Sequence, residues 1–265
     1  MQGKRTVSLL RKWQNKSWFV WIVPAALVIL WQILGQLGII STRILPTPVA
    51  VVKSLFTLIG NGMLFDYIGT STTRALIGFA IGGGIGLILG LLNGIVPLAE
   101  KLIDTSVQMI RNIPHLALIP LVILWFGIGE AAKLFLVALG VAFPIYLNTF
   151  HGIRTVDPGL IEMGRVYGLR GLPLFWKVIL PGALPSILVG VRFSLGIMWI
   201  SLIVAETISA DSGIGYMAMN AREFMQMDIV VLSIILYALL GKLSDSIAKY
   251  FEGLFLQWHP NYRKG

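Results

Sequence analysis

Few side chains in this sequence are able to do chemistry, and they do not form a catalytic pattern. The three histidines, His115, His151 and His259, are far apart along the chain, no cysteine is present, and no His-Glu-x-x-His motif occurs. A cysteine nucleophile and a thiolate metal site are therefore excluded. The pair Gly241-Lys242 lacks the Ser or Thr that directly follows the lysine of a phosphate-binding loop. We expect no catalytic residue, no metal and no cofactor.

Five polar side chains stand inside or at the ends of apolar segments, where such groups often mark the path of a solute. Arg192 either attracts an anion that leaves on the cytoplasmic side, extends to the membrane surface or pairs with a carboxylate of a loop. Glu206, at the outer end of the predicted fifth span, is expected to cap or brace the outer gate rather than to contact an anion. His115 is either a cavity donor or a hydrogen-bonded structural residue, and Asn148 and Thr149 are neutral donors suited to a weak solute path.

The composition indicates an integral membrane protein. Hydrophobic residues make up 56% of the chain, charged residues only 12%, and the mean hydropathy is +0.83. Soluble domains carry about 25% charged residues. The net charge of +9 is therefore better explained by basic loops facing the cytoplasm than by nucleic-acid binding.

Charge-free stretches predict an all-α protein with about six transmembrane helices. A span needs about 20 mainly apolar residues to cross roughly 30 Å of hydrocarbon. The uncharged run that begins at Ser17 is too long for a signal peptide and is expected to remain as the first span. The predicted spans lie at about Trp18–Ile40, Ala75–Ala99, Asn112–Gly129, Leu134–Ile153, Ala183–Ala205 and residues 229–251.

The basic residues set the expected orientation. Of the 21 Lys and Arg residues, 16 are assigned to the side that holds the N-tail, and the acidic residues divide evenly between the two sides. The basic residues assigned to the outer side are Arg43, Lys53, Arg74, Lys133 and Arg222. Both termini are therefore predicted to be cytoplasmic. On the outer side, the segment that starts at Pro48 is expected to form an interfacial helix ending at Gly60–Gly62.

One membrane domain is expected to account for the chain. The predicted boundaries are a basic cytoplasmic N-tail at 1–17, a transmembrane domain at 18–258 with a cytoplasmic loop at about 154–182, and a cytoplasmic C-tail at 259–265. In the second span, glycines recur every four residues and predict a face on which another helix backbone can approach closely; they are at positions 78, 82, 86, 90 and 94.

The cytoplasmic loop between predicted spans four and five is unusually rich in glycine, proline and basic residues. Asp157-Pro158 is typical of a helix start, and Gly168 suits a left-handed cap at the end of that helix. A second short helix is expected at 174–180, with Pro181 and Pro185 at the entry to span five. A compact helix–Gly–helix of this kind is suited to docking a cytosolic partner.

At these residues the chain resembles the permease subunits of bacterial ATP-binding-cassette importers that depend on a binding protein. Their loop pattern is E-A-A-x-x-x-G, nine residues, then I-x-L-P. This chain has Glu162, Gly168 and Val178-Ile-Leu-Pro181 at that spacing, with Met163 and Gly164 in place of the two alanines. The segments STRILPTP, FPIYLNTFHGIR and VAETISADSGIGYMAMNAREF resemble the subfamily that imports sulfonates, taurine, nitrate and related anions, and most of all its aliphatic sulfonate permeases.

The resemblance implies the type I importer permease fold and the corresponding partners. These are a second permease copy, cytosolic ATP-binding subunits that perform the hydrolysis, and an extracytoplasmic solute-binding protein, assembled in the bacterial inner membrane. The loop would be the coupling helix seated in the ATPase. Its implied contact residues are Glu162, Tyr167, Gly168, Leu169, Leu172 and Pro181.

Other classes remain open from the residues alone. An ion-coupled secondary transporter usually shows internal repeats and a carboxylate near the middle of the membrane, and neither is evident here. A structural membrane scaffold would not need the docking loop. An intramembrane enzyme is the weakest alternative, because no catalytic constellation is present.

Overall fold

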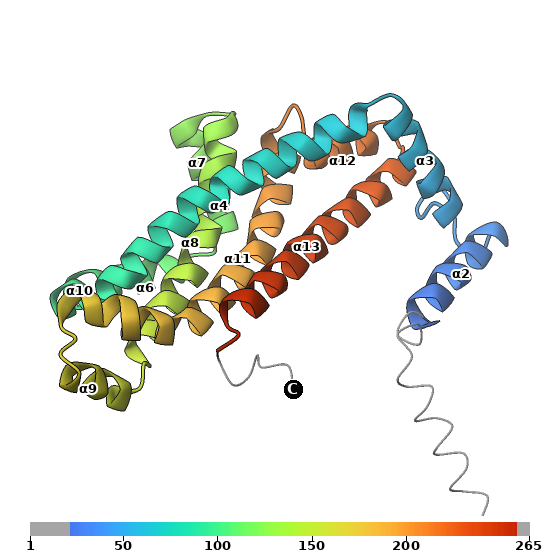
Figure 1. The fold of residues 1–265 in the computed structure, drawn as a ribbon. Coiled ribbons are helices and arrows are strands. Elements are labelled where there is room, and N and C mark those ends of the chain that lie inside the picture. The colour runs from blue at the N-terminus through green and yellow to red at the C-terminus, as the bar shows by residue number, and fades with distance from the viewer. Residues whose placement is uncertain (1–21, 259–265) are drawn as a thin grey trace, which may run out of the picture. The chain divides into compact units, whose positions relative to one another are not determined.

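The computed structural model describes residues 22–258 (Figure 1). These residues form two compact units. Within the described residues, unit 1 comprises 22–64 and 220–232, and unit 2 comprises 65–219 and 233–258. Every regular element in this part of the chain is helical. The predicted N-tail, the first residues of the first predicted span and the C-tail lie outside the described residues.

Unit 1 contains helices α2, Ile22–Gln36, and α3, Pro48–Gly60. Helix α3 begins where the sequence predicts: Thr47 is its N-cap, with Oγ1 accepting from the Ala50 N–H at 3.4 Å, and proline occupies the first turn. The chain leaves α3 through Gly62, whose φ is +78°. The predicted interfacial helix is thus confirmed in its bounds.

Unit 2 is built on four long apolar helices. They are α4 (Met63–Ile95), α8 (Glu130–Arg154), α11 (Leu180–Ser209) and α13 (Met227–Phe255), of which α4 and α13 each have one end in unit 1. By length and composition, the described residues hold four helices able to cross a membrane, or five if one bent pair is a single span. The expected count of six is therefore not established, and α2, with 15 residues, is shorter than a span requires.

The third predicted span, Asn112–Gly129, is not a straight helix. Helix α6, Thr105–Arg111, stops before Pro114, a 3-10 turn follows at His115–Leu118, and α7 runs only over Ile119–Phe126. The helical segments on the two sides of this break are bent by 80°. Proline cannot continue the hydrogen-bond ladder and restricts the residue before it, which explains the position of the break.

The glycine face of α4 packs against α8, as its spacing predicts. A Cβ placed on Gly82 or Gly86 would overlap the backbone of Ala138 or Ala142. On Gly78 it would lie 2.6 Å from Val137 Cγ1. Only a missing side chain lets the two helix backbones approach this closely. By contrast, Gly84, on another face of α4, has no atom within 4 Å of such a Cβ.

The expected second short helix of the loop is not separate from the following span. Helix α10, Gly171–Leu174, continues through a π-helical turn, Phe175–Ile179, directly into α11. Pro181 lies in the first turn of α11, and Pro185 lies inside this helix. The wider π-helical turn directly precedes Pro181, where a backbone donor is missing, so the chain can stay helical through this proline.

Helices α8 and α11 are packed against each other, and two buried apolar clusters mark the two ends of this pair. One consists of Val122, Ala132, Leu136 and Ala205. The other consists of Ile153, Val156, Ala183 and Ile187. Because α8 and α11 meet N-terminus to C-terminus at each cluster, they run antiparallel, and the loop between them lies at the second cluster (Figure 1).

Candidate functional site

The predicted docking loop begins as a capped helix. Helix α9, Pro158–Val166, starts at Asp157, whose Oδ1 accepts a hydrogen bond from the Gly159 N–H at 2.8 Å. Aspartate at this position satisfies an N–H group that has no partner within the helix, and proline fits the first turn. The sequence-based expectation of a helix start at Asp157-Pro158 is confirmed.

The same helix ends at a left-handed glycine. Gly168 has φ +83° and donates its N–H to the Arg165 carbonyl at 3.0 Å, while Leu169 donates to the Gly164 carbonyl at 2.9 Å. These two bonds form a Schellman motif, which reverses the chain sharply at a residue without a Cβ. A tight, fixed turn at Gly168 was expected from the sequence and is confirmed.

Three apolar side chains next to this turn point away from the protein. Val166, Tyr167 and Leu172 are 86%, 80% and 73% exposed, and we call them the loop surface. Glu162 is also exposed, whereas Leu169 and Pro181 are partly buried. Isolated exposed apolar residues are common, but three at one rigid turn fit a surface prepared for a partner.

The inner side of the loop is fixed to the membrane helices. Ile161 of α9 and Ile179 pack against the buried cluster at the end of α8 and α11. A Cβ on the buried Gly164 would meet Leu174 Cδ1 at 2.8 Å and Val178 Cγ2 at 3.2 Å, so α9 lies close against the next helical segment. The loop surface is therefore carried by a packed element.

At the other end of the α8–α11 pair, Glu206 is the centre of a buried hydrogen-bond network. Its Oε1 accepts from Arg74 Nη1 at 2.9 Å, and its Oε2 accepts from the Gly215 N–H and from Tyr237 Oη, each at 2.9 Å. Ser71 Oγ lies 2.8–2.9 Å from both oxygens. The Glu206 side chain is 0% exposed, and four donor groups of the protein satisfy its buried charge.

The network continues through Arg74 to helix α8. Arg74 Nε and Nη2 donate to the two oxygens of Glu130 at 2.7 and 2.5 Å, and Nη1 also donates to the Ser212 carbonyl at 2.6 Å. Lys133, also buried, donates to Glu130 at 2.8 Å. Glu206 thus braces α4, α8, α11 and α13 together, as one of its two sequence interpretations predicts, and an anion could reach it only by displacing this network.

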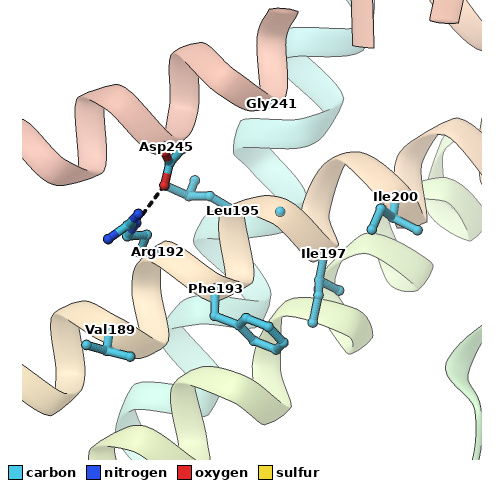
Figure 2. Close-up of a pocket in the computed structure, with 9 residues that line it drawn as sticks. Val189, Arg192, Phe193, Leu195, Ile197, Ile200, Gly241 and Asp245 are labelled. Atoms are coloured by element: carbon cyan, nitrogen blue, oxygen red, sulfur yellow. Dashed lines mark hydrogen bonds and ion pairs between the residues drawn. The ribbon is translucent and has the colours of Figure 1, made fainter. Parts of the chain in front are cut away.

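Arg192 pairs with carboxylates of helix α13. Its Nε donates to Asp245 Oδ1 at 2.6 Å (Figure 2). Its Nη1 lies 3.6 Å from Glu252 Oε2. The arginine side chain remains 35% exposed. Pairing with a carboxylate was one of the alternatives for this residue, and the partners are on the last helix instead of in a loop.

The other candidate residues are mainly tied to the protein itself. His115 Nε2 lies 2.9 Å from Ser201 Oγ, which joins the 3-10 turn to α11. Asn148 donates to the Pro144 carbonyl at 2.9 Å. Thr149 is fully buried, and its Oγ1 has no hydrogen-bond partner among the described residues. The structure does not bring His115, Asn148, Thr149, Arg192 and Glu206 together into one site.

Sequence reasoning missed most of the Glu206 network. Arg74 and Lys133 were interpreted as loop charges on the outer side, yet both are buried within helices. Arg74 lies about three turns inside the apolar helix α4, and this position is the signal that could have found it, because such a charge needs a buried partner. Lys133 lies in the first turn of α8, where the sequence gives no comparable signal. Within residues 22–258, the acidic residues and histidines form no cluster suited to a metal ion.

The described residues thus combine long apolar helices with a short loop whose exposed apolar side chains lie at one end of the α8–α11 pair. Residues 82–255 match the sequence profile of the binding-protein-dependent transport system inner membrane component family. Because the match spans well over half of the chain, the protein belongs to this family.

Individual relatives agree with the family. The chain is 62% identical to the aliphatic sulfonates transport permease protein SsuC of Escherichia coli, over 93% of this chain and 95% of that protein. It is 44% identical to the SsuC protein of Bacillus subtilis, over 98% and 95% of the two chains. It is 32% identical to the taurine transport system permease protein TauC of Escherichia coli, over 89% and 87%.

Solved structures show the same fold. An amino acid ABC transporter chain superposes with a TM-score of 0.62 at 18% identity, covering 75% of this chain and 96% of that one. A chain of the inward-facing methionine transporter MetNI gives 0.52 at 23% identity, covering 74% and 97%. The importer permease fold expected from the loop pattern is confirmed.

Proposed function

We propose that this chain is the permease subunit of an ATP-driven importer and forms the translocation path for aliphatic sulfonates across the bacterial inner membrane. The carrying observation is the 62% identity to a sulfonate permease over nearly the full length of both chains. Identity to the taurine permease is about half as high. In this proposal the permease binds no nucleotide itself, and separate ATP-binding subunits supply the energy.

The loop surface is the proposed docking site for those subunits. Val166, Tyr167 and Leu172 offer apolar side chains for a groove, and the Schellman turn at Gly168 holds them in one arrangement. Because Ile161 and Ile179 pack on the end of the α8–α11 pair, a displacement of the loop must move these helices. Nucleotide binding would thereby shift the permease between inward- and outward-facing states.

The orientation and the remaining partners belong to the same proposal. The excess of basic residues on the side of the loop supports cytoplasmic termini and a cytoplasmic loop. An extracytoplasmic solute-binding protein would deliver the sulfonate on the opposite side, and a second copy of the permease would complete the path.

The docking assignment is tested by truncating the loop surface. Tyr167→Ala and Leu172→Ala remove exposed side chains, so membrane insertion and thermal stability should stay at the wild-type level. Co-purification of the ATP-binding subunits should fall sharply. Leu124→Ala is the matched control, because Leu124 is 77% exposed on α7, outside the loop. Wild-type co-purification of both loop variants would refute the assignment.

The substrate is tested by uptake in cells with and without the gene under sulfur starvation. Labelled ethanesulfonate, taurine and nitrate are compared, and loss of ethanesulfonate uptake with little or partial loss of taurine uptake is expected. If only the uptake of another anion is lost, the importer assignment stands and the substrate is that anion. Uptake that persists after ATP depletion with an intact ion gradient would favour a secondary transporter.

A further inference from the structure

Arg192 and Asp245 lie at the side of a cavity of about 500 Å³ between α11 and α13 (Figure 2). Val189, Phe193 and Ile200 line it from one side of α11, and each is at least half exposed. Phe193 lies one turn after Val189, and Ile200 lies two turns after Phe193, so the three side chains share one helix face. The cavity therefore combines an apolar strip several turns long with a guanidinium at one side.

Two glycines keep this cavity open. Gly196 on α11 and Gly241 on α13 both line it, and a Cβ added to Gly196 would meet no atom within 4 Å. At Gly241 the nearest atom to such a Cβ is Trp199 Cδ1 at 4.0 Å. The space between the helices is thus not filled by side chains of the described residues, and a linear alkyl chain fits along the strip.

In the described part of the chain, the ion pairs around Arg192 join more cationic side chains than carboxylates. Asp245 pairs with Arg192 and also with Lys242 at 3.5 Å and Lys249 at 3.3 Å, while Glu252 lies 3.6 Å from Arg192. Three cations thus face two carboxylates. Asp245 keeps two cationic partners if Arg192 Nε turns away from it, whereas Arg192 is the only cation beside the buried Glu252 among the described residues. The exchange therefore requires Arg192 to keep its Nη1 contact with Glu252 while Nε changes its acceptor.

We propose that this cavity binds the alkanesulfonate during its passage through the permease. The sulfonate group replaces Asp245 as the acceptor for Arg192, and the alkyl chain lies on the strip formed by Val189, Phe193 and Ile200. A planar guanidinium suits the oxygens of such an anion. This inference rests on the proposed function and adds a defined site to it.

An anionic phospholipid shares this chemistry, because it also combines an anionic head with an alkyl chain. The free sulfonate is the occupant that the substrate class favours. The experiment must therefore separate a soluble sulfonate from a lipid, and also from a second permease copy closing over the strip.

The absence of cysteine allows a direct test in the assembled complex. Gly196→Cys places a single thiol inside the cavity, and Gly253→Cys places one on α13 outside it, where a Cβ also meets no atom within 4 Å. The permease–ATPase complex, without its binding protein, is placed in nanodiscs of zwitterionic lipid. Maleimide labelling of the permease is measured against increasing ethanesulfonate, hexanesulfonate or hexylammonium. Ile200→Cys serves as a second reporter if Gly196→Cys fails to assemble.

Hexanesulfonate should protect the cavity thiol at lower concentration than ethanesulfonate, and neither should protect the thiol at position 253. Adding Phe193→Ala should raise the half-protecting hexanesulfonate concentration about 5- to 10-fold, through lost apolar contact, and change that for ethanesulfonate by less than about twofold. Leu239→Ala, an exposed α13 residue outside the cavity, should change neither. Asp245→Asn should lower the half-protecting concentrations of hexanesulfonate and ethanesulfonate about threefold, because the charge that competes for Arg192 is removed. Arg192→Lys should raise the half-protecting concentrations of both sulfonates.

Three results would overturn this site. The first is protection of the cavity thiol by hexylammonium equal to that by hexanesulfonate. The second is protection by phosphatidylglycerol equal to that by the sulfonate. The third is a cavity thiol that is unreactive without ligand and forms a disulfide with a second permease copy. Absence of protection in a complex that still imports ethanesulfonate in cells would also reject the site while leaving the importer assignment intact. Failure of uptake itself would instead reject the proposed function.

Discussion

Glu206→Gln is the most informative perturbation of the helix bundle, because the substitution keeps the shape and removes only one charge and one acceptor. Oε1 of Glu206 accepts from Arg74, and Oε2 accepts from the Gly215 N–H. Both donors are obligate, since neither can turn its hydrogen into an acceptor. Whichever way the glutamine amide is turned, its NH₂ group must therefore face one of them.

The expected cost follows from burial. An unsatisfied buried donor costs about 1–3 kcal/mol, and removing one partner of a buried ion pair costs about 3–5 kcal/mol. Arg74 retains Glu130, so we expect the lower end, about 3 kcal/mol. For a domain of this size, such a loss lowers the midpoint of thermal unfolding by roughly 6–12 °C.

The assay is the thermal midpoint of the purified permease–ATPase complex, followed by the intrinsic fluorescence and by recovery of the permease in size exclusion. Asp211→Asn is the control, because Asp211 lies 3.8 Å from Arg74 but its side chain is 91% exposed. Exposed pairs contribute little, so its midpoint should match the wild type. The expected decrease is at least about 6 °C. A midpoint for Glu206→Gln within about 2 °C of the wild type would therefore refute the claim that the network braces the bundle.

Three further predictions concern other positions. Gly82→Leu should prevent stable packing of α4 on α8, because a side chain there meets the backbone of Ala138, whereas Gly84→Leu should be tolerated; protease resistance of the purified protein distinguishes them. Thr149→Val should be neutral or raise the unfolding free energy by about 1 kcal/mol, because it removes a buried hydroxyl without a described partner; a loss of uptake at unchanged thermal midpoint would instead place Thr149 on the solute path. Gly168→Val should abolish recovery of the ATP-binding subunits without loss of membrane insertion, because a β-branched residue is strained at φ +83°; wild-type recovery would show that the turn is not needed for docking.

The elements that the sequence predicts correctly are those fixed by local rules. The start of α3 at Thr47-Pro48, the start of α9 at Asp157-Pro158 and the turn at Gly168 each depend on one or two residues with a strong backbone preference. The glycine face of α4 is also visible in the sequence, because glycines spaced four residues apart lie on one face of any helix. The sequence does not show which helix packs on that face. Such local preferences do not depend on how the rest of the chain folds.

The features that could not be predicted depend on which helices meet. Hydropathy treats Asn112–Gly129 as one span, but the direction of the chain after Pro114 is set by contacts such as that of His115 with Ser201. Arg74 and Lys133 look like boundary charges because nothing in a linear sequence shows that Glu206 and Glu130 lie beside them. Arg192 likewise remained ambiguous until its partners on α13 were located.

The positions of the two sites suggest how docking and transport are connected under the proposed function. The loop surface is fixed to one end of the α8–α11 pair by apolar packing, which tolerates small sliding motions. The Glu206 network fixes the other end of this pair to α4 and α13 through hydrogen bonds. Because hydrogen bonds are directional, they do not tolerate such sliding. A push on the loop would therefore rotate the helices about the Glu206 end, and the largest displacement would occur near the loop. Arg192 and Asp245 lie between these two ends, on helices α11 and α13, so such a rotation would open and close the cavity that they line.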